Sequence, residues 1–415
     1  MSMDKNCVLS HNKFDIRIFF VLLIASLNIL LTIFQFQLYN GYVSFCDFAG
    51  QWKLCAYALQ GIDPYPLIGS NHAVIESVGT IPKGWGASPW GLLLGNIFYP
   101  GFLSFDNAKI YFVMINLVLL CITALCVSRK LQKISKRLSW YSFVCSLFSF
   151  WSVYSIEQGN AGCGICCLLL LVILYHETCP IFSGFLLGLA MVKPQITLIL
   201  CVAFLVIKCY RVVITSFLVV LVSLLAISGI VHNDPVSLIY EFLNAGIGNN
   251  QNYAGIFTLL FMNNKFLAMT LSMLTGTVLV GVLTHCLPKN IYKPFYFFPA
   301  CLVGTFWSYS FYNEFYILLL PLLVCNFWVL NASGGLAAIA AFLSSLYITV
   351  GSFILVYFPS VYFDLFDILT IPILVTNDVW LNMWIARTAF EIGLVLVMFA
   401  LIFILNKDYK QILFG

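Results

Sequence analysis

Long runs of apolar residues, such as 108–128 and 212–231, recur along this chain of 415 residues. A helix needs roughly 20 mostly apolar residues to cross a bilayer, whereas the strands of a membrane barrel are short and alternate in polarity. Only 9% of the residues are charged, compared with about 25% in an ordinary soluble domain. These features exclude a soluble domain and predict an all-α polytopic membrane protein.

Basic residues predict how the spans are oriented, because they gather in the loops on the cytoplasmic side. The densest basic group lies between Arg129 and Arg137. Placing it and the other basic groups in the cytoplasm predicts twelve spans with both termini inside. The predicted spans are residues 18–38, 108–128, 138–156, 161–175, 180–192, 195–207, 212–231, 267–287, 294–308, 315–331, 335–357 and 385–406.

The chain is predicted to form one integral membrane domain over residues 1–415, with a core over 18–330 and further helices over 331–415. No small-residue cleavage site follows the first apolar run, so we expect this run to stay as an anchor. The predicted inner loops carry no glycine-rich nucleotide-binding motif, which argues against a cytosolic nucleotide-sugar donor. We expect a bacterial inner membrane, lipids around the spans, an active site on the non-cytoplasmic face and no nucleic-acid partner.

Five predicted outer segments combine amides, aromatic residues and isolated charges. They are residues 47–65, 157–160, 193–195, 249–253 and 307–314. Ionisable groups at membrane depth usually face a cavity and pair with one another, which makes these residues candidates for a functional site. Lys193 precedes Pro194, and proline interrupts a helix because it removes a backbone donor. The lysine ammonium binds a phosphate, pairs with a structural partner such as Glu157 or Glu314, or snorkels to the outer interface.

The other polar residues have a structural interpretation beside the functional one. Gln158 and Asn160 either join helices or contact a sugar. Tyr309 and Tyr312 belong either to an interfacial aromatic belt or to the site. Asp47 is either a solvated loop residue or an acid with a catalytic role. Cys163 and Cys166 have the two-residue spacing of a metal or redox pair, but no second pair and no histidine partner lies in the same loop, so we expect no metal and no cofactor.

Several motifs follow one another along the chain in an order found in a known family. The first are Asp47-Phe48, leading to Gly61-Ile62-Asp63-Pro64-Tyr65, and Ser88-Pro89-Trp90. The later ones are Gln158-Gly159-Asn160, and Gly184 to Gly188 running into Lys193-Pro194-Gln195. Over residues 18–330 this order resembles the polyprenyl-phosphate-dependent glycosyltransferases of the GT-C fold, closest to glycosyltransferase family 87, which includes mannosyltransferases. The single Pro89 and the altered order around Gly159 depart from the family pattern.

The resemblance implies inverting transfer, with Asp47 as the general base on the acceptor hydroxyl. It implies a polyprenyl-phosphate sugar as the donor, carrying a hexose such as mannose, and a lipid-linked or glycan acceptor. The departing lipid phosphate gains charge, and Lys193 is the candidate cation to stabilise it, with Gln195, Tyr309 and Tyr312 as supporting donors. Further substrate contacts are expected from Gln195, Asp63, Tyr65, Gln158, Asn160, Gln251, Tyr309, Tyr312 and Glu314.

Two other functions stay open from the sequence. An O-antigen polymerase or ligase also has many spans, but such enzymes usually carry several arginines in outer loops. In this chain Arg387 is the one arginine expected outside. A lipid-linked sugar transporter or flippase commonly shows two related halves. No second Asp-Phe pair occurs in the second half of this chain, which favours the glycosyltransferase interpretation.

Overall fold

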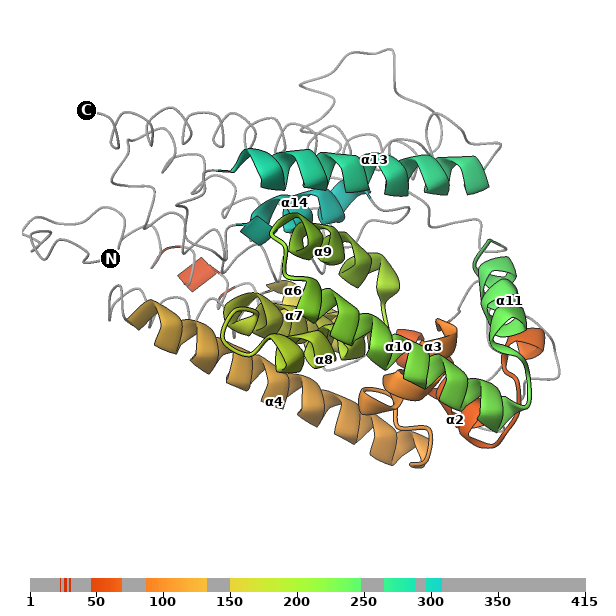
Figure 1. Ribbon diagram of the computed structural model, residues 1–415. Coiled ribbons are helices and arrows are strands. Elements are labelled where there is room, and N and C mark those ends of the chain that lie inside the picture. The colour runs from red at the N-terminus through yellow and green to blue at the C-terminus, as the bar shows by residue number, and fades with distance from the viewer. Residues whose placement is uncertain are drawn as a thin grey trace, which may run out of the picture.

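The computed structural model describes residues 46–68, 87–132, 150–247, 265–287 and 296–307, together with positions 23, 26, 27 and 30. Within these ranges the regular structure is helical, with no strand. The helices are α2 (Cys46–Leu59), η1 (Tyr65–Leu67), α3 (Pro89–Leu94), η2 (Gly95–Ile97), α4 (Phe105–Gln132), α6 (Phe150–Glu157), α7 (Gly162–Tyr175), α8 (Pro180–Ala190), α9 (Pro194–Val206), α10 (Tyr210–Val231), α11 (Pro235–Ile247), α13 (Lys265–Cys286) and α14 (Phe298–Trp307). The short helices α2, α3 and α11 gather around one end of α10 (Figure 1).

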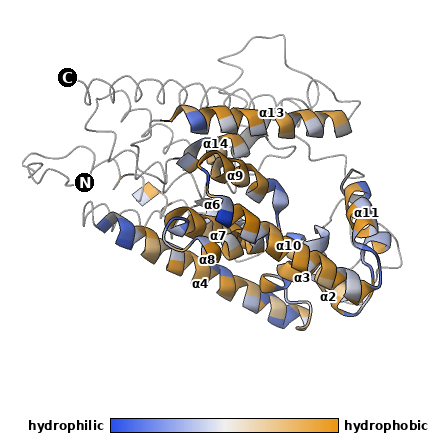
Figure 2. Cartoon of the chain, viewed as in Figure 1, coloured by the Kyte–Doolittle hydropathy of each residue, from blue (hydrophilic) through white to orange (hydrophobic). Residues whose placement is uncertain are grey.

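Two of the described helices are long and apolar enough to cross a membrane. They are Phe105–Lys130 within α4, and Tyr210–Val231, which is α10. Large apolar side chains on both are exposed, such as Met114 on α4 and Val222 on α10, and Figure 2 shows these helices largely in the hydrophobic colour. An exposed apolar face on a helix of this length suits lipid rather than water. The described part of the chain therefore has the character of an all-α membrane protein.

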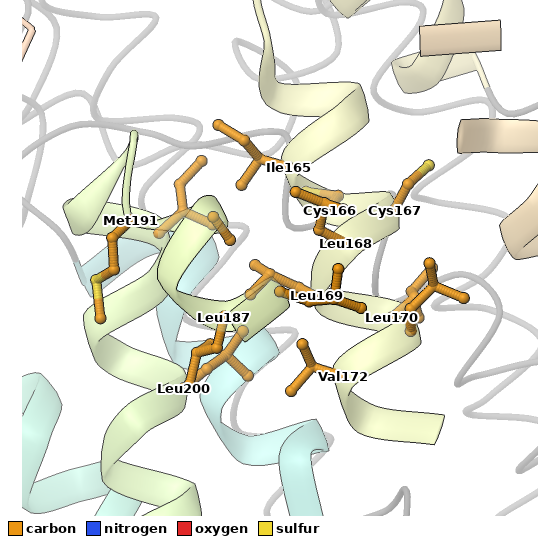
Figure 3. Packing of buried hydrophobic residues seen from close by; sticks show 14 of the residues in the cluster. Ile165, Cys166, Cys167, Leu168, Leu169, Leu170, Val172, Leu187, Met191 and Leu200 are labelled. Carbon is orange, nitrogen blue, oxygen red and sulfur yellow. The ribbon is translucent and has the colours of Figure 1, made fainter. Parts of the chain in front are cut away.

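Helix α7 lies among α4, α6 and α8 and is buried on every side over almost its whole length. Figure 3 shows Leu169 of α7 close to Leu187 of α8, and both belong to the same buried apolar cluster. A helix that is hydrophobic all round belongs in the interior of a larger protein or bundle. The position of α7 is therefore set by neighbouring helices rather than by lipid.

Two glycines let α8 and α10 approach each other closely. A Cβ atom added at Gly184 would lie 2.7 Å from the carbonyl oxygen of Val212, and one added at Gly188 would lie 3.1 Å from that of Ser216. Residues four positions apart lie on the same face of a helix. Small residues on one face permit close packing of membrane helices. The glycine-rich segment before Lys193 is thus a helix-packing surface.

The predicted interruption at Lys193 is present, because α8 and α9 are separate helices with this residue between them. The Thr197 hydroxyl donates a hydrogen bond to the carbonyl oxygen of Ala190 (2.7 Å). The Trp90 indole N–H donates to the carbonyl oxygen of Met191 (2.7 Å). Both bonds satisfy carbonyl groups that a helix end leaves without an intrahelical partner. The break is therefore held by α9 on one side and by α3 on the other.

Within the described ranges the helices agree with the predicted spans, and their ends differ by a few residues. For example, α7, α10 and α13 correspond to the spans predicted at 161–175, 212–231 and 267–287. The spans predicted at 315–331, 335–357 and 385–406 lie outside the described residues. The count of twelve spans and the boundary at residue 330 therefore stay predictions.

Candidate active site

The Asp47-Phe48 pair lies in the first turn of α2. Phe48 is fully buried, and its ring centroid lies 5.6 Å from that of Tyr99 and 5.3 Å from that of Phe112. Asp47 is partly exposed, and the positive end of the helix dipole favours a carboxylate at this position. The Asp47 backbone N–H donates to the carbonyl oxygen of Gln158 (3.2 Å). The aromatic member of the pair therefore anchors α2, and the acidic member lies against the end of α6.

The segment Gln158-Gly159-Asn160 is the turn that ends α6. Gly159 has a φ of 71°, in the left-handed region that glycine adopts without steric penalty. Its N–H donates to the carbonyl oxygen of Ile156 (3.0 Å), and the Asn160 N–H donates to that of Ser155 (2.9 Å). These two bonds form a Schellman motif, which satisfies the last carbonyl groups of a helix. The motif thereby sets the position of Asn160.

Two hydroxyl groups hold this turn in place. The Tyr99 side chain is 2% exposed, and its hydroxyl accepts from the Ala161 N–H (2.8 Å) and donates to the carbonyl oxygen of Gly159 (3.4 Å). The Ser155 hydroxyl donates to the carbonyl oxygen of Asn160 (2.9 Å) and accepts from the N–H of Cys163 (2.9 Å). Buried backbone groups need such partners. The hydroxyls supply them, so the turn is fixed by the protein itself.

The Asn160 side chain joins an acid and a cation that lie far apart in the sequence. Its Nδ2 donates to Oδ2 of Asp47 (2.9 Å). Its Oδ1 accepts from Nζ of Lys193 and from the N–H of Gly162 (2.8 Å). A carboxylate only accepts hydrogen bonds and an ammonium only donates them, so the two partners fix which end of the amide faces which charge. We refer to Asp47, Asn160 and Lys193 as the bridged cluster.

Lys193 enters the bridged cluster from the interruption between α8 and α9. Its φ of −115° and ψ of 83° leave the helical region. Its N–H donates to the carbonyl oxygen of Ala190 (3.2 Å), and its own carbonyl oxygen accepts from the Thr197 hydroxyl (3.1 Å). The cluster places a group that can take up a proton near a group that can stabilise an anion, which are the two requirements of acid–base group transfer.

Asp63 and Tyr65 form a second polar cluster beyond the other end of α2. Oδ1 of Asp63 accepts from the Tyr65 N–H (3.0 Å), and Oδ2 accepts from Nδ2 of Asn233 (2.7 Å). The Tyr65 hydroxyl donates to the carbonyl oxygen of Ala87 (2.7 Å). The helix separates this cluster from Asp47, because the rise from residue 47 to residue 59 is about 18 Å. The described contacts place the two aspartates in different clusters, and the expected substrate contacts of Asp63 and Tyr65 stay predictions.

Glu241 of α11 belongs to this second cluster. Burial raises the pKa of Glu241, and a hydrogen bond with Asp63 and the negative charge of Asp63 raise it further. Burial, followed by the charges of Asp63 and Glu241, also raises the pKa of the Tyr65 hydroxyl. The ring centroids of Tyr65 and Phe242 lie 6.4 Å apart. The second cluster therefore fastens α11 to the segment that follows α2.

The comparison with known families covers most of the described helices. Residues 89–290 match the model of glycosyltransferase family 87. The predicted family resemblance is confirmed. Asn160 and Lys193 lie within the matched residues, and Asp47 precedes them. The family 87 match supports a glycosyltransferase function for the chain. No curated protein matches the chain significantly.

The remaining predicted site residues are only partly described. Gln195 lies half-buried in the first turn of α9, inside the family 87 region. Gln251, Tyr309, Tyr312 and Glu314 lie outside the described residues. Among the residues that are described, no three His, Cys, Asp or Glu side chains are grouped so that they could hold a metal ion.

Sequence reasoning missed three residues that shape the two clusters. Tyr99 was indistinguishable from the many aromatic residues of the apolar segments, and nothing local to Ser155 marks it as the partner of a turn. Glu241 had a signal, because it is a single acid in an otherwise largely apolar helix. Its pairing with Asp63 joins residues that are far apart in the sequence, so no local pattern marks it.

Proposed function

We propose that this chain is a membrane glycosyltransferase of the GT-C fold that transfers a hexose from a polyprenyl-phosphate sugar to a lipid-linked or glycan acceptor. Mannose is the candidate hexose, and the transfer inverts the anomeric centre. One observation carries the proposal: Asp47 and Lys193 are hydrogen-bonded to the same amide, that of Asn160. The family 87 match over residues 89–290 supports the reaction class.

Asp47 is the proposed general base. The acceptor hydroxyl loses its proton as its oxygen attacks the anomeric carbon, and the Asp47 carboxylate takes up that proton. A carboxylate in this role contributes roughly 10²- to 10⁴-fold to the rate. The hydrogen bond from Asn160 to Oδ2 supports this assignment, because it restricts the orientation of the carboxylate.

Lys193 is the proposed partner of the departing phosphate. The bond between the anomeric carbon and the phosphate oxygen breaks as the new glycosidic bond forms, and both electrons of the broken bond stay on the lipid phosphate. A fixed cation that lies where this negative charge develops stabilises the transition state, most strongly where water is scarce. The position of Lys193 at a helix break next to apolar helices suits such a role.

The membrane arrangement forms part of the same proposal. Twelve spans, cytoplasmic termini and a site on the non-cytoplasmic face of a bacterial inner membrane would let the enzyme take its donor from the outer leaflet. The two long apolar helices of the described ranges support a location in a membrane. The Lys130 ammonium lies over the ring of Tyr175 (4.9 Å to the centroid) at the far end of α7 from Asn160, which fits basic loops on the side opposite the site.

The test uses membranes that contain the full chain, supplied with a radiolabelled polyprenyl-phosphate hexose and lipid-linked acceptors. We expect Asp47→Asn to lower the initial rate of transfer by about 10²- to 10⁴-fold. Asp106→Asn is the matched control, since Asp106 is a largely exposed acid in the first turn of α4, paired with Lys109 (2.8 Å). The control should transfer sugar at nearly the parent rate.

The result distinguishes the proposed glycosyltransferase from the alternative functions. Full transfer by Asp47→Asn would reject Asp47 as the base. Movement of the labelled lipid across the membrane without transfer would indicate a flippase, and transfer of a preassembled glycan from a diphosphate lipid alone would indicate a polymerase or ligase. Lys193→Ala should raise the donor concentration needed for half-maximal rate more than Lys193→Arg does, and equal effects would argue for a structural lysine.

A further inference from the structure

The amide of Asn160 is largely used by the protein itself. A side-chain amide has two N–H donors and two acceptor lone pairs. Both acceptor positions are taken, by Nζ of Lys193 and by the N–H of Gly162. One donor is directed to Oδ2 of Asp47. At most one N–H is therefore left for a sugar hydroxyl, which is little for a residue whose main task is substrate recognition.

The backbone of Asn160 is fixed as firmly as its side chain. Its N–H is bound by the carbonyl of Ser155 within the Schellman motif, and its carbonyl oxygen accepts from the Ser155 hydroxyl. The Gly162 N–H fixes the side-chain oxygen from the first turn of α7. A residue held in this way transmits the geometry of the scaffold to its partners, and effective sites depend on such support.

The fixed amide of Asn160 forms side-chain hydrogen bonds with the two charged groups of the site, Asp47 and Lys193. The amide oxygen lies toward the cation and the amide N–H lies toward the anion, so the dipole of the amide is favourable to both charges. We propose that Asn160 is a positioning residue, which fixes the spacing and orientation of the base Asp47 and the cation Lys193. This inference rests on the proposed function and replaces the expected role of Asn160 as a sugar contact.

A positioning role has consequences that a sugar contact lacks. Alanine at position 160 would remove the hydrogen bonds through which the amide joins Asp47 to Lys193. Misplacement of a catalytic group by about 1 Å can lower the rate by about 10²-fold. The loss would fall mainly on kcat, since the substrate contacts themselves would remain. Aspartate at position 160 keeps the shape of the side chain and adds a negative charge beside Asp47. A second carboxylate at this distance disfavours ionisation of the base.

The experiment measures transfer from a polyprenyl-phosphate hexose by the full chain in membranes, over a range of pH, for the parent, Asn160→Ala and Asn160→Asp. We expect Asn160→Asp to move the acidic limb of the pH–rate profile upward by about one pH unit or more. We expect Asn160→Ala to lower kcat by about 10²-fold with a smaller change in KM. Both variants leave the ionisable groups of the neighbouring elements unchanged. These include Lys53 in α2, Tyr99 before α4, Glu157 in α6 and Lys193 at the helix break.

Asn96→Asp is the matched control, because within the described residues the amide of Asn96 forms its hydrogen bonds with backbone atoms: it donates to the carbonyl oxygens of Leu92 and Leu93 and accepts from the Gly101 N–H. It should leave the acidic limb in place, whatever it does to the yield of folded protein. An unmoved limb in Asn160→Asp, or a loss in Asn160→Ala confined to KM, would overturn the positioning role while transfer still depended on Asp47. Full activity of Asp47→Asn would instead overturn the proposed function itself, and the positioning role with it.

Discussion

Replacing Gly159 by alanine tests whether the turn after α6 holds the residues of the bridged cluster in position. The glycine has a φ of 71°, where an L-residue with a Cβ atom is disfavoured by about 1–2 kcal/mol. That free energy corresponds to a factor of about 5–30 in an equilibrium. If the turn relaxes, the population with Asn160 in place falls by this factor, and the rate of sugar transfer falls with it. If the turn stays as it is, the same 1–2 kcal/mol is lost from the free energy of unfolding.

Both quantities are measurable on the same preparation, by initial rates of transfer in membranes and by thermal unfolding in detergent. The matched control is Gly229→Ala in α10, because Gly229 is exposed and an added Cβ atom would meet nothing within 4 Å. Alanine should stabilise that helix by about 0.5–1 kcal/mol, since glycine loses more entropy on folding. Parent-like rates together with parent-like stability in Gly159→Ala would refute the reasoning.

The remaining predictions concern pH and metal ions. The folded protein raises the pKa of Glu241 above its ordinary value of 4.5. The stability that the protonated side chain contributes to the fold is therefore fully present below pH 4.5, and it is lost as the pH rises through the raised pKa. Glu241→Gln is neutral at every pH, so it should raise the melting temperature at pH 7 and change it little at pH 4. A melting temperature at pH 7 that equals that of the parent or lies below it would contradict the pairing with Asp63. We also expect transfer to survive EDTA, because a monophosphate donor leaves as a stable anion opposite Lys193; activity lost in EDTA and restored by magnesium or manganese would count against this mechanism.

The membrane helices were predictable because their signal is local. A run of apolar residues has to cross the bilayer whatever surrounds it, so the positions of α4 and α10 follow from their composition. The break at Lys193 was predictable for the same reason, since proline acts on its own helix. The burial of α7 on every side was not visible in this way, because a helix facing protein and one facing lipid are equally apolar.

The sequence analysis assigned Asp47 and Lys193 to one candidate site, but it did not show which residue joins them. Asp47 and Asn160 are 113 positions apart, and Asn160 and Lys193 are 33 apart, so only the tertiary structure brings them together. Asp47 and Asp63 show how far the sequence leaves such connections open. Both precede α3 in the sequence, but the regular helix between them carries Asp63 toward α11.

The length of α7 has a consequence for how a substrate arrives. Its 14 residues rise about 21 Å, whereas the hydrocarbon layer of a bilayer is about 30 Å thick. If the Tyr175 end is level with one boundary of that layer, Asn160 lies below the opposite boundary by about 9 Å. The polar head of a lipid would then have to sink, or the leaflet to thin, before it could meet the lysine. Local bilayer deformation around this protein would become a step of the reaction cycle, and the thickness of the host membrane would become one of its rate-determining variables.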